Sequence, residues 1–203
     1  HVIKPLVQLL GSGGQRAHSH SANALSSLAF DNGTNQVQIT QMLIELLSTG
    51  VMEAQVRAVQ ALWRQVHENP TAHERIAKAG DAAALVELLK TGTPEGKDYA
   101  TWSFSKSITS ENQQIFADSG GVEPLVDQLR DPRPVIQDQA AEAVALLALD
   151  NVECQNTICK KGGVVPLIRL LTPSDPEDAK CQAVLRSAAG AVANLAVQPA
   201  ARD

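Results

Sequence analysis

Apolar residues recur along the chain in five similar blocks of six residues. In each block the second residue is Leu, the third is Val or Ile, the fourth is polar and the last is Leu. Successive blocks start 37, 42, 40 and 42 residues apart, a period typical of helical repeat proteins. We call each block a hexad, and the hexads are Pro5–Leu10, Met42–Leu47, Ala84–Leu89, Pro124–Leu129 and Pro166–Leu171.

A second, alanine-rich block follows each hexad at a regular distance. One position in it, which we call the ladder position, lies 22 residues after the hexad start in the first four cases and 28 in the fifth. Four equal spacings indicate a true internal repeat. The ladder positions are Ser27, Arg64, Lys106, Leu146 and Asn194.

The residues around the ladder position predict a helix with one buried stripe. The residues two before and two after it are apolar in all five blocks, an i, i+4 pair that marks one helix face. The residues six and three before it are always Ala or Ser, which lets neighbouring helices approach closely.

Short polar segments that end in glycine precede the later hexads, at Thr71–Gly80, Asn112–Gly121 and Asn151–Gly163. Glycine favours the end of one helix and a sharp turn into the next. Pro124 and Pro166 fit the first turn of the helix that follows, where a missing N–H costs nothing. Each repeat is therefore predicted to hold a short helix, a glycine step, a second helix and a longer third helix.

This pattern resembles the armadillo repeat family over essentially the whole chain. The matching residues are the start Gly162, Gly163, Pro166, Leu167 and Ile168 and the end Ala191–Ala196. The related HEAT family usually lacks the short first helix and its glycine step. The resemblance implies an all-α, right-handed α-solenoid of about five armadillo repeats with three helices each.

Three departures modify this expectation. The first repeat lacks its short helix and is incomplete, and the segment Asp31–Gln41 is a truncated short helix. Thr172–Lys180, which holds the six extra residues of the fifth repeat, is expected to be a solvated loop. We interpret 1–203 as one domain excerpted from a longer protein, with repeats at approximately 1–32, 33–69, 70–110, 111–150 and 151–198.

Composition narrows the class of protein. With 17 basic and 22 acidic residues the chain has a net charge of −5, which argues against nucleic acid as a general partner. Three widely spaced cysteines favour a reducing compartment, the cytoplasm or the nucleus. No run of apolar residues is long enough for a membrane span.

The sequence displays no catalytic or metal-binding constellation. Gly11, Gly13 and Gly14 follow a helix rather than a strand, and no Lys-Ser or Lys-Thr pair follows them as in a phosphate-binding loop. His18 and His20 are two residues apart and diverge on a helix. Cys154 and Cys159 have no His nearby. We therefore predict no enzyme, no metal and no cofactor.

In armadillo proteins the third helices line a concave groove, and the resemblance places the ladder positions in it. Members that recognise nuclear-import signals carry Asn at this position and Trp four residues earlier, and the Asn pairs with the ligand backbone. Here Asn194 has Gly190 four residues before it, and Trp102 precedes Lys106. No repeat has a Trp–Asn pair, which argues against a nuclear-signal import adaptor.

Basic and aromatic residues at these positions suggest a different ligand. Arg64 and Lys106 occupy adjacent ladder positions, and Arg57, Tyr99 and Trp102 lie one or two helical turns before them. Such a cluster suits an acidic or phosphorylated segment, although exposed helix faces carry charge in any case. The predicted groove residues are Ser27, Arg57, Gln60, Arg64, Tyr99, Trp102, Lys106, Glu142, Leu146 and Asn194.

The function predicted is a scaffold for protein–protein interaction that binds a partner segment along the groove. One alternative is an architectural module that self-associates end to end through its end faces, headed by Val2, Ile3 and Leu6. Another is a regulatory domain of a larger enzyme.

Overall fold

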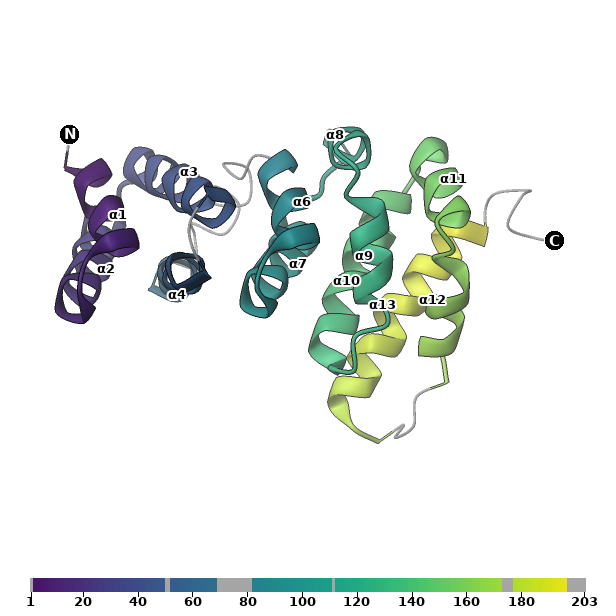
Figure 1. The fold of residues 1–203 in the computed structure, drawn as a ribbon. Helices are drawn as coiled ribbons and strands as arrows, with labels where there is room; N and C mark the ends of the chain where they lie inside the picture. The colour runs from purple at the N-terminus through teal and green to yellow at the C-terminus, as the bar shows by residue number, and fades with distance from the viewer. Residues whose placement is uncertain (1, 50–51, 69–81, 111, 173–176, 197–203) are drawn as a thin grey trace. The chain divides into compact units, whose positions relative to one another are not determined.

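The computed structural model describes residues 2–49, 52–68, 82–110, 112–172 and 177–196, and every regular element in these ranges is a helix (Figure 1). Contacts divide the chain into two compact parts, His1–Ala100 and Thr101–Asp203, which we call the N-terminal and C-terminal parts. Among the described residues no helix has the length and apolar character needed to cross a membrane.

The N-terminal part contains five helices and the beginning of a sixth within its described ranges. Helices α1 to α4 pack against one another in every pairing, and α3 also contacts α6. Leu residues from α1, α2, α3 and α4 form the centre of this packing. The helices are α1 (Ile3–Ser12), α2 (Gln15–Ala29), α3 (Gly33–Thr49), α4 (Met52–Glu68), α6 (Ala82–Thr91) and α7 (Pro94–Ser107), which continues into the C-terminal part.

The C-terminal part shows the predicted three-helix pattern twice. Each set has a short helix, a second helix and a long third helix, and the two third helices, α10 and α13, pack along each other (Figure 1). The first set is α8 (Gln113–Asp118), α9 (Val122–Gln128) and α10 (Pro134–Ala148), and the second is α11 (Val152–Lys160), α12 (Val164–Leu170) and α13 (Ala179–Ala196).

The glycine steps between first and second helices have the expected geometry. Gly120 and Gly162 adopt positive φ values of 81° and 75°. At the second step, the Gly162 N–H donates to the Cys159 carbonyl and the Gly163 N–H donates to the Ile158 carbonyl, each at 3.0 Å. This pair of hydrogen bonds is typical of a helix that ends with glycine in the left-handed region. The prediction is confirmed at these two steps, whereas Thr71–Gly80 lies outside the described residues.

The prediction of a separate truncated helix at Asp31–Gln41 is wrong. Residues 33–49 form one continuous helix, α3, which includes the second hexad. No Gly or Pro occurs between Thr34 and Thr49, so nothing in the sequence breaks the helix at the point where the glycine step is missing. The helix starts after Asp31, with a φ of 52°, and the Asn35 N–H donates to Asn32 Oδ1 at 3.0 Å.

The insertion in the fifth repeat is partly helical. The third helices α2, α4, α7 and α10 begin 12 residues before their ladder positions, but α13 begins at Ala179, 15 residues before Asn194. The Lys180 N–H donates to Asp178 Oδ1 at 3.0 Å at the start of this helix. The predicted loop thus ends before Ala179, because Asp178 offers an acceptor to the first turn. Residues 173–176 lie outside the described residues.

Buried glutamines cap the C-terminal ends of two third helices, a feature that was not predicted from the sequence. Gln36 Nε2 donates to the Ala29 carbonyl at 2.8 Å, and Gln155 Nε2 donates to the Ala148 carbonyl at 2.7 Å. The last carbonyls of a helix have no partner within that helix, so the Gln155 amide satisfies the Ala148 carbonyl, and the Gln36 amide adds a second bond to the Ala29 carbonyl, which also accepts from the Asn32 N–H at 3.1 Å. Each Gln ends an Asp-Asn-x-x-x-Gln segment, and this repeat was available in the sequence.

Replacing either of two glycines of the C-terminal part by alanine should change the free energy of unfolding, and the two changes should have opposite signs. A Cβ added at Gly190, inside α13, meets nothing within 4 Å, so Gly190→Ala should raise the free energy of unfolding by about 0.5–1 kcal/mol. Gly162 has a φ of +75°, so Gly162→Ala should lower it by about 1–2 kcal/mol. Urea unfolding of the two variants measures both changes. Equal signs would contradict this account of the two backbones.

Candidate partner-binding face

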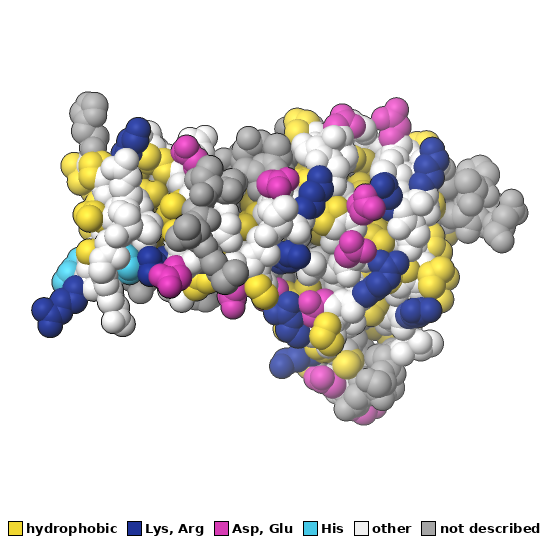
Figure 2. Space-filling view, in the orientation of Figure 1, with side chains coloured by type: hydrophobic (Ala, Val, Ile, Leu, Met, Phe, Trp, Pro, Cys, Tyr) yellow, Lys and Arg dark blue, Asp and Glu magenta, His cyan; other side chains and the backbone are white. Residues whose placement is uncertain are grey.

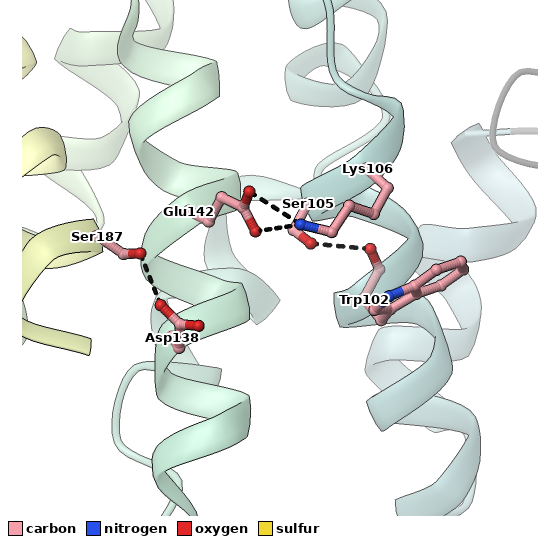
Figure 3. Close-up of polar contacts among 6 residues, drawn as sticks. All are labelled: Trp102, Ser105, Lys106, Asp138, Glu142 and Ser187. Atoms are coloured by element: carbon pink, nitrogen blue, oxygen red, sulfur yellow. Dashed lines mark hydrogen bonds and ion pairs between the residues drawn. The ribbon is translucent and has the colours of Figure 1, made fainter. Parts of the chain in front are cut away.

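In the C-terminal part, polar side chains of three third helices meet on one surface. It is formed by the end of α7 and by α10 and α13 (Figure 3). Lys106 is exposed there, and the other two ladder residues, Leu146 and Asn194, are partly exposed. We call this surface the C-terminal ladder face, and its residues are Trp102, Lys106, Asp138, Glu142, Leu146, Ser187, Gly190 and Asn194.

An ion pair joins α7 to α10 on this face. Lys106 Nζ donates to Glu142 Oε2 at 2.7 Å and to Glu142 Oε1 at 2.9 Å (Figure 3). The two side chains are 39% and 38% exposed. An ion pair this exposed contributes little to stability, about 0–1 kcal/mol, so it mainly fixes where the two charges lie.

Two hydrogen bonds join α10 to α13. Ser187 Oγ donates to Asp138 Oδ1 at 2.6 Å (Figure 3), and Asn194 Nδ2 donates to the carbonyl of Ala145 at 2.9 Å. An Asn side chain has two N–H donors and an oxygen acceptor. The Asn194 amide therefore keeps one N–H and its oxygen without a recorded bond among the described residues.

Bare helix backbone lies between these two polar contacts. Gly190 is exposed, and the space where its Cβ would lie is open. A ligand can approach a helix closely only where no side chain projects, and glycine provides that access. The C-terminal ladder face therefore combines fixed charges, an amide and an accessible stretch of helix.

The prediction that Tyr99 and Trp102 offer aromatic surface in the groove is corrected, because both side chains are buried. Tyr99 is only 1% exposed and belongs to the core. Trp102 is 9% exposed, and its carbonyl accepts from Ser105 Oγ at 3.0 Å. A large aromatic ring stabilises the core more than an exposed face, and helical spacing alone does not reveal which packing it finds. Tyr99 is thus not available to a ligand, and Trp102 offers little surface.

In the N-terminal part the predicted groove residues Ser27 and Gln60 are exposed. Arg57 Nη2 donates to Glu53 Oε2 of the same helix at 2.9 Å. Arg57 and Gln60 line a hollow of about 110 Å³ together with His18, whose Nε2 is buried without a hydrogen-bond partner among the described residues.

The structure describes the side chains of only two of the three basic residues in the predicted cluster, Arg57 and Lys106. The Arg64 side chain lies outside the described residues, so its ligand-binding role stays a prediction. Lys106 and Arg57 are each paired with a carboxylate of the chain itself. Figure 2 shows basic and acidic side chains interspersed over the helices of the C-terminal part on the visible face. An acidic ligand would therefore have to exchange with Glu142 to reach Lys106.

No group of three His, Cys, Asp or Glu side chains that could hold a metal ion occurs in the described part of the chain. Burial, followed by the negative charges of Asp118 and Glu153, raises the pKa of Cys154 to about 11. Burial also raises the pKa of Cys159.

Comparison with known proteins places this geometry in a family. The Armadillo/beta-catenin-like repeat family matches this chain over residues 109–149, which include α8, α9 and α10. An engineered protein of known structure is 30% identical, with a TM-score of 0.72 over 98% of this chain and 48% of its own. A designed armadillo repeat protein is 24% identical, with a TM-score of 0.71 over 98% of this chain and 84% of its own.

This chain is an armadillo-repeat protein. Its fold is the all-α solenoid type expected from the sequence, and the family typically serves as protein-binding scaffolds.

Two plant proteins are also similar to this armadillo-repeat protein. Importin subunit alpha-1b of Oryza sativa subsp. japonica is 27% identical over 160 residues, which are 71% of this chain and 29% of the importin. Importin subunit alpha-2 of Arabidopsis thaliana is 28% identical over 125 residues, which are 60% of this chain and 22% of the importin. The chain thus spans less than a third of each relative's length.

The burial of Cys154 predicts a thiol that stays unreactive while the protein is folded. With a pKa of about 11, roughly one molecule in a thousand carries the thiolate at about pH 8. Brief treatment with iodoacetamide at that pH should label Cys154 only after urea is added, whereas the partly exposed Cys181 should be labelled in the native protein. Mass spectrometry of the peptides measures both. Equal labelling of the two thiols without urea would contradict the packing described.

Proposed function

We propose that this armadillo-repeat protein is a non-catalytic scaffold that binds a segment of a partner protein along its C-terminal ladder face. The observation that carries the proposal is the bridge from Lys106 to Glu142, two charges held in place on neighbouring third helices and more than a third exposed. Accessible charges in fixed positions can complement the charges of a partner, which gives a binding face its specificity and its rate of association.

The backbone of an extended segment finds complementary groups beside this bridge. Asn194 offers one N–H and its amide oxygen, the pair of groups that matches a peptide bond. The open surface at Gly190 lets the segment come close to α13. Contacts from three third helices then add along one continuous strip.

The partner segment carries an acidic or phosphorylated side chain that exchanges with Glu142. The carboxylate of Glu142 already occupies the place on Lys106 Nζ that a ligand carboxylate would take. Charge-assisted hydrogen bonds of this kind are worth about 1.5–3 kcal/mol when water is excluded.

A basic segment is the second candidate, because the C-terminal ladder face holds two carboxylates one turn apart on α10, Glu142 bound to Lys106 and Asp138 bound to Ser187. One structural relative, 24% identical, is a designed armadillo repeat protein in complex with a (KR)4 peptide. For either ligand we propose a place of action in the cytoplasm or the nucleus.

Single substitutions distinguish these ligands by the sign of their effect. Fluorescence anisotropy measures the affinity for a (KR)4 peptide and for its charge mirror, an (ED)4 peptide. If the acidic ligand is right, Lys106→Gln should weaken (ED)4 binding roughly tenfold, and Glu142→Gln should strengthen it by removing the competing carboxylate. If the basic ligand is right, Glu142→Gln should weaken (KR)4 binding and Lys106→Gln should strengthen it.

The chain offers a matched control for these variants. Lys161 Nζ donates to Glu123 Oε2 at 2.7 Å in a similarly exposed pair that joins α9 to the end of α11, away from the third helices. Lys161→Gln and Glu123→Gln should leave both affinities unchanged. Equal effects of the Lys106 and Lys161 variants would show that only net charge matters, and the ladder face would lose its role.

A further inference from the structure

Two packed third helices of the N-terminal part, α2 and α4, line the hollow of about 110 Å³ described above. Its volume would hold about three or four water molecules, or one group the size of a phosphoryl group. The polar residues that line it are His18 and Ser19 of α2 and Arg57 and Gln60 of α4, and none of the described lining residues is acidic. The hollow is therefore lined by a positive charge, in a chain whose net charge is −5.

The imidazole of His18 is the strongest sign that this hollow takes a ligand. Its Nε2 atom is buried and has no hydrogen-bond partner among the described residues. Buried polar atoms are nearly always hydrogen-bonded, so an unpaired one indicates a missing partner. Because the ring itself lines the hollow, a small rotation of the side chain would let an Nε2–H donate to a group bound there.

Arg57 supplies the positive charge. Its Nη2 donates to Glu53 Oε2 at 2.9 Å, and the two side chains are 25% and 80% exposed. Glu53 does not line the hollow, so the carboxylate holds the guanidinium from the solvent side. An Arg side chain has five N–H donors, and those on Nε and Nη1 have no recorded partner among the described residues. Water in the hollow would satisfy His18 but would leave this charge without a use, whereas an oxyanion uses both.

We propose that this hollow binds a phosphoryl group, whose oxygens accept from Arg57 and from His18 Nε2. Donors from two helices suit a tetrahedral group with three acceptor oxygens better than a planar carboxylate. Gln60 and Ser19 are exposed and offer further hydrogen bonds, since the Ser19 hydroxyl has only a long bond, 3.4 Å, to the Gln15 carbonyl. The hollow lies in the N-terminal part, so its ligand does not depend on the C-terminal ladder face.

Titration of the chain with inorganic phosphate, at constant pH and ionic strength, tests the proposal by NMR. The ring Hε1 signal of His18 should shift until the site is saturated. His20, which is exposed two residues further along α2 and does not line the hollow, should show no such shift. The amide signals of Ala22 and Ala61, which also line the hollow, give the dissociation constant in variants that lack His18.

Matched substitutions separate the site from net charge. Arg57→Gln should weaken phosphate binding at least about tenfold, because charge-assisted hydrogen bonds are lost. Arg16→Gln removes the same charge from an exposed position of α2 outside the hollow and should leave the affinity unchanged. His18→Ala should weaken binding and His20→Ala should not. His18→Gln replaces His18→Ala if circular dichroism shows that the latter is unfolded.

Two peptides identify the source of the phosphoryl group. One carries a single phosphoserine among glycines, and the other has serine in its place and should not bind. Binding of the phosphopeptide at least about tenfold tighter than inorganic phosphate would assign the group to a segment of a partner protein. An affinity no tighter than that of inorganic phosphate would assign it to a small phosphate compound.

Acetate at the same ionic strength should leave the His18 signal in place. The proposal would be overturned by an unshifted His18 signal in phosphate, by an equal shift in acetate, or by equal affinities of the Arg57 and Arg16 variants or of the His18 and His20 variants.

Discussion

The close approach of neighbouring helices through small side chains is the constraint on which the rest of this structure depends. The residue six before each ladder position is Ser21, Ala58, Ala100, Ala140 or Ala188, and all five are buried. In the C-terminal part, Ala140 and Ala188 belong to α10 and α13, which pack along each other. Helices can approach this closely only where side chains are small, and the apolar residues on either side then pack across the interface.

The polar face follows from that spacing. Because α13 lies close to α10, the short Ser187 side chain reaches Asp138, and Asn194 reaches a main-chain carbonyl. The longer Lys106 side chain spans the distance from α7 to Glu142. The side chains that are offered to a partner are thus held by neighbouring helices, which lowers the entropy lost when a partner binds.

The sequence alone predicts the repeat and much of its packing, because period and side-chain size are local properties. The buried small residues and the glycine steps at Gly120 and Gly162 were predicted correctly for this reason. What depends on partners distant in sequence was missed: the pairing of Lys106 with a residue 36 positions away, and the burial of Tyr99. The glutamine caps had a visible signal in their repeated Asp-Asn-x-x-x-Gln segments, but their acceptors are carbonyls, which a sequence does not display.

The central claim, that stacking on a neighbouring repeat governs the structure, is tested most directly by equal substitutions at Ala141 and Ala189. These residues hold the same place in successive repeats and differ in whether a further repeat covers them. Urea unfolding at low protein concentration measures the result. Ala141→Leu should lower the free energy of unfolding by about 1–3 kcal/mol, because the added carbons overfill a closed interface. Ala189→Leu should change it by less than about 0.5 kcal/mol. Equal losses at the two positions, or none at Ala141, would contradict the account.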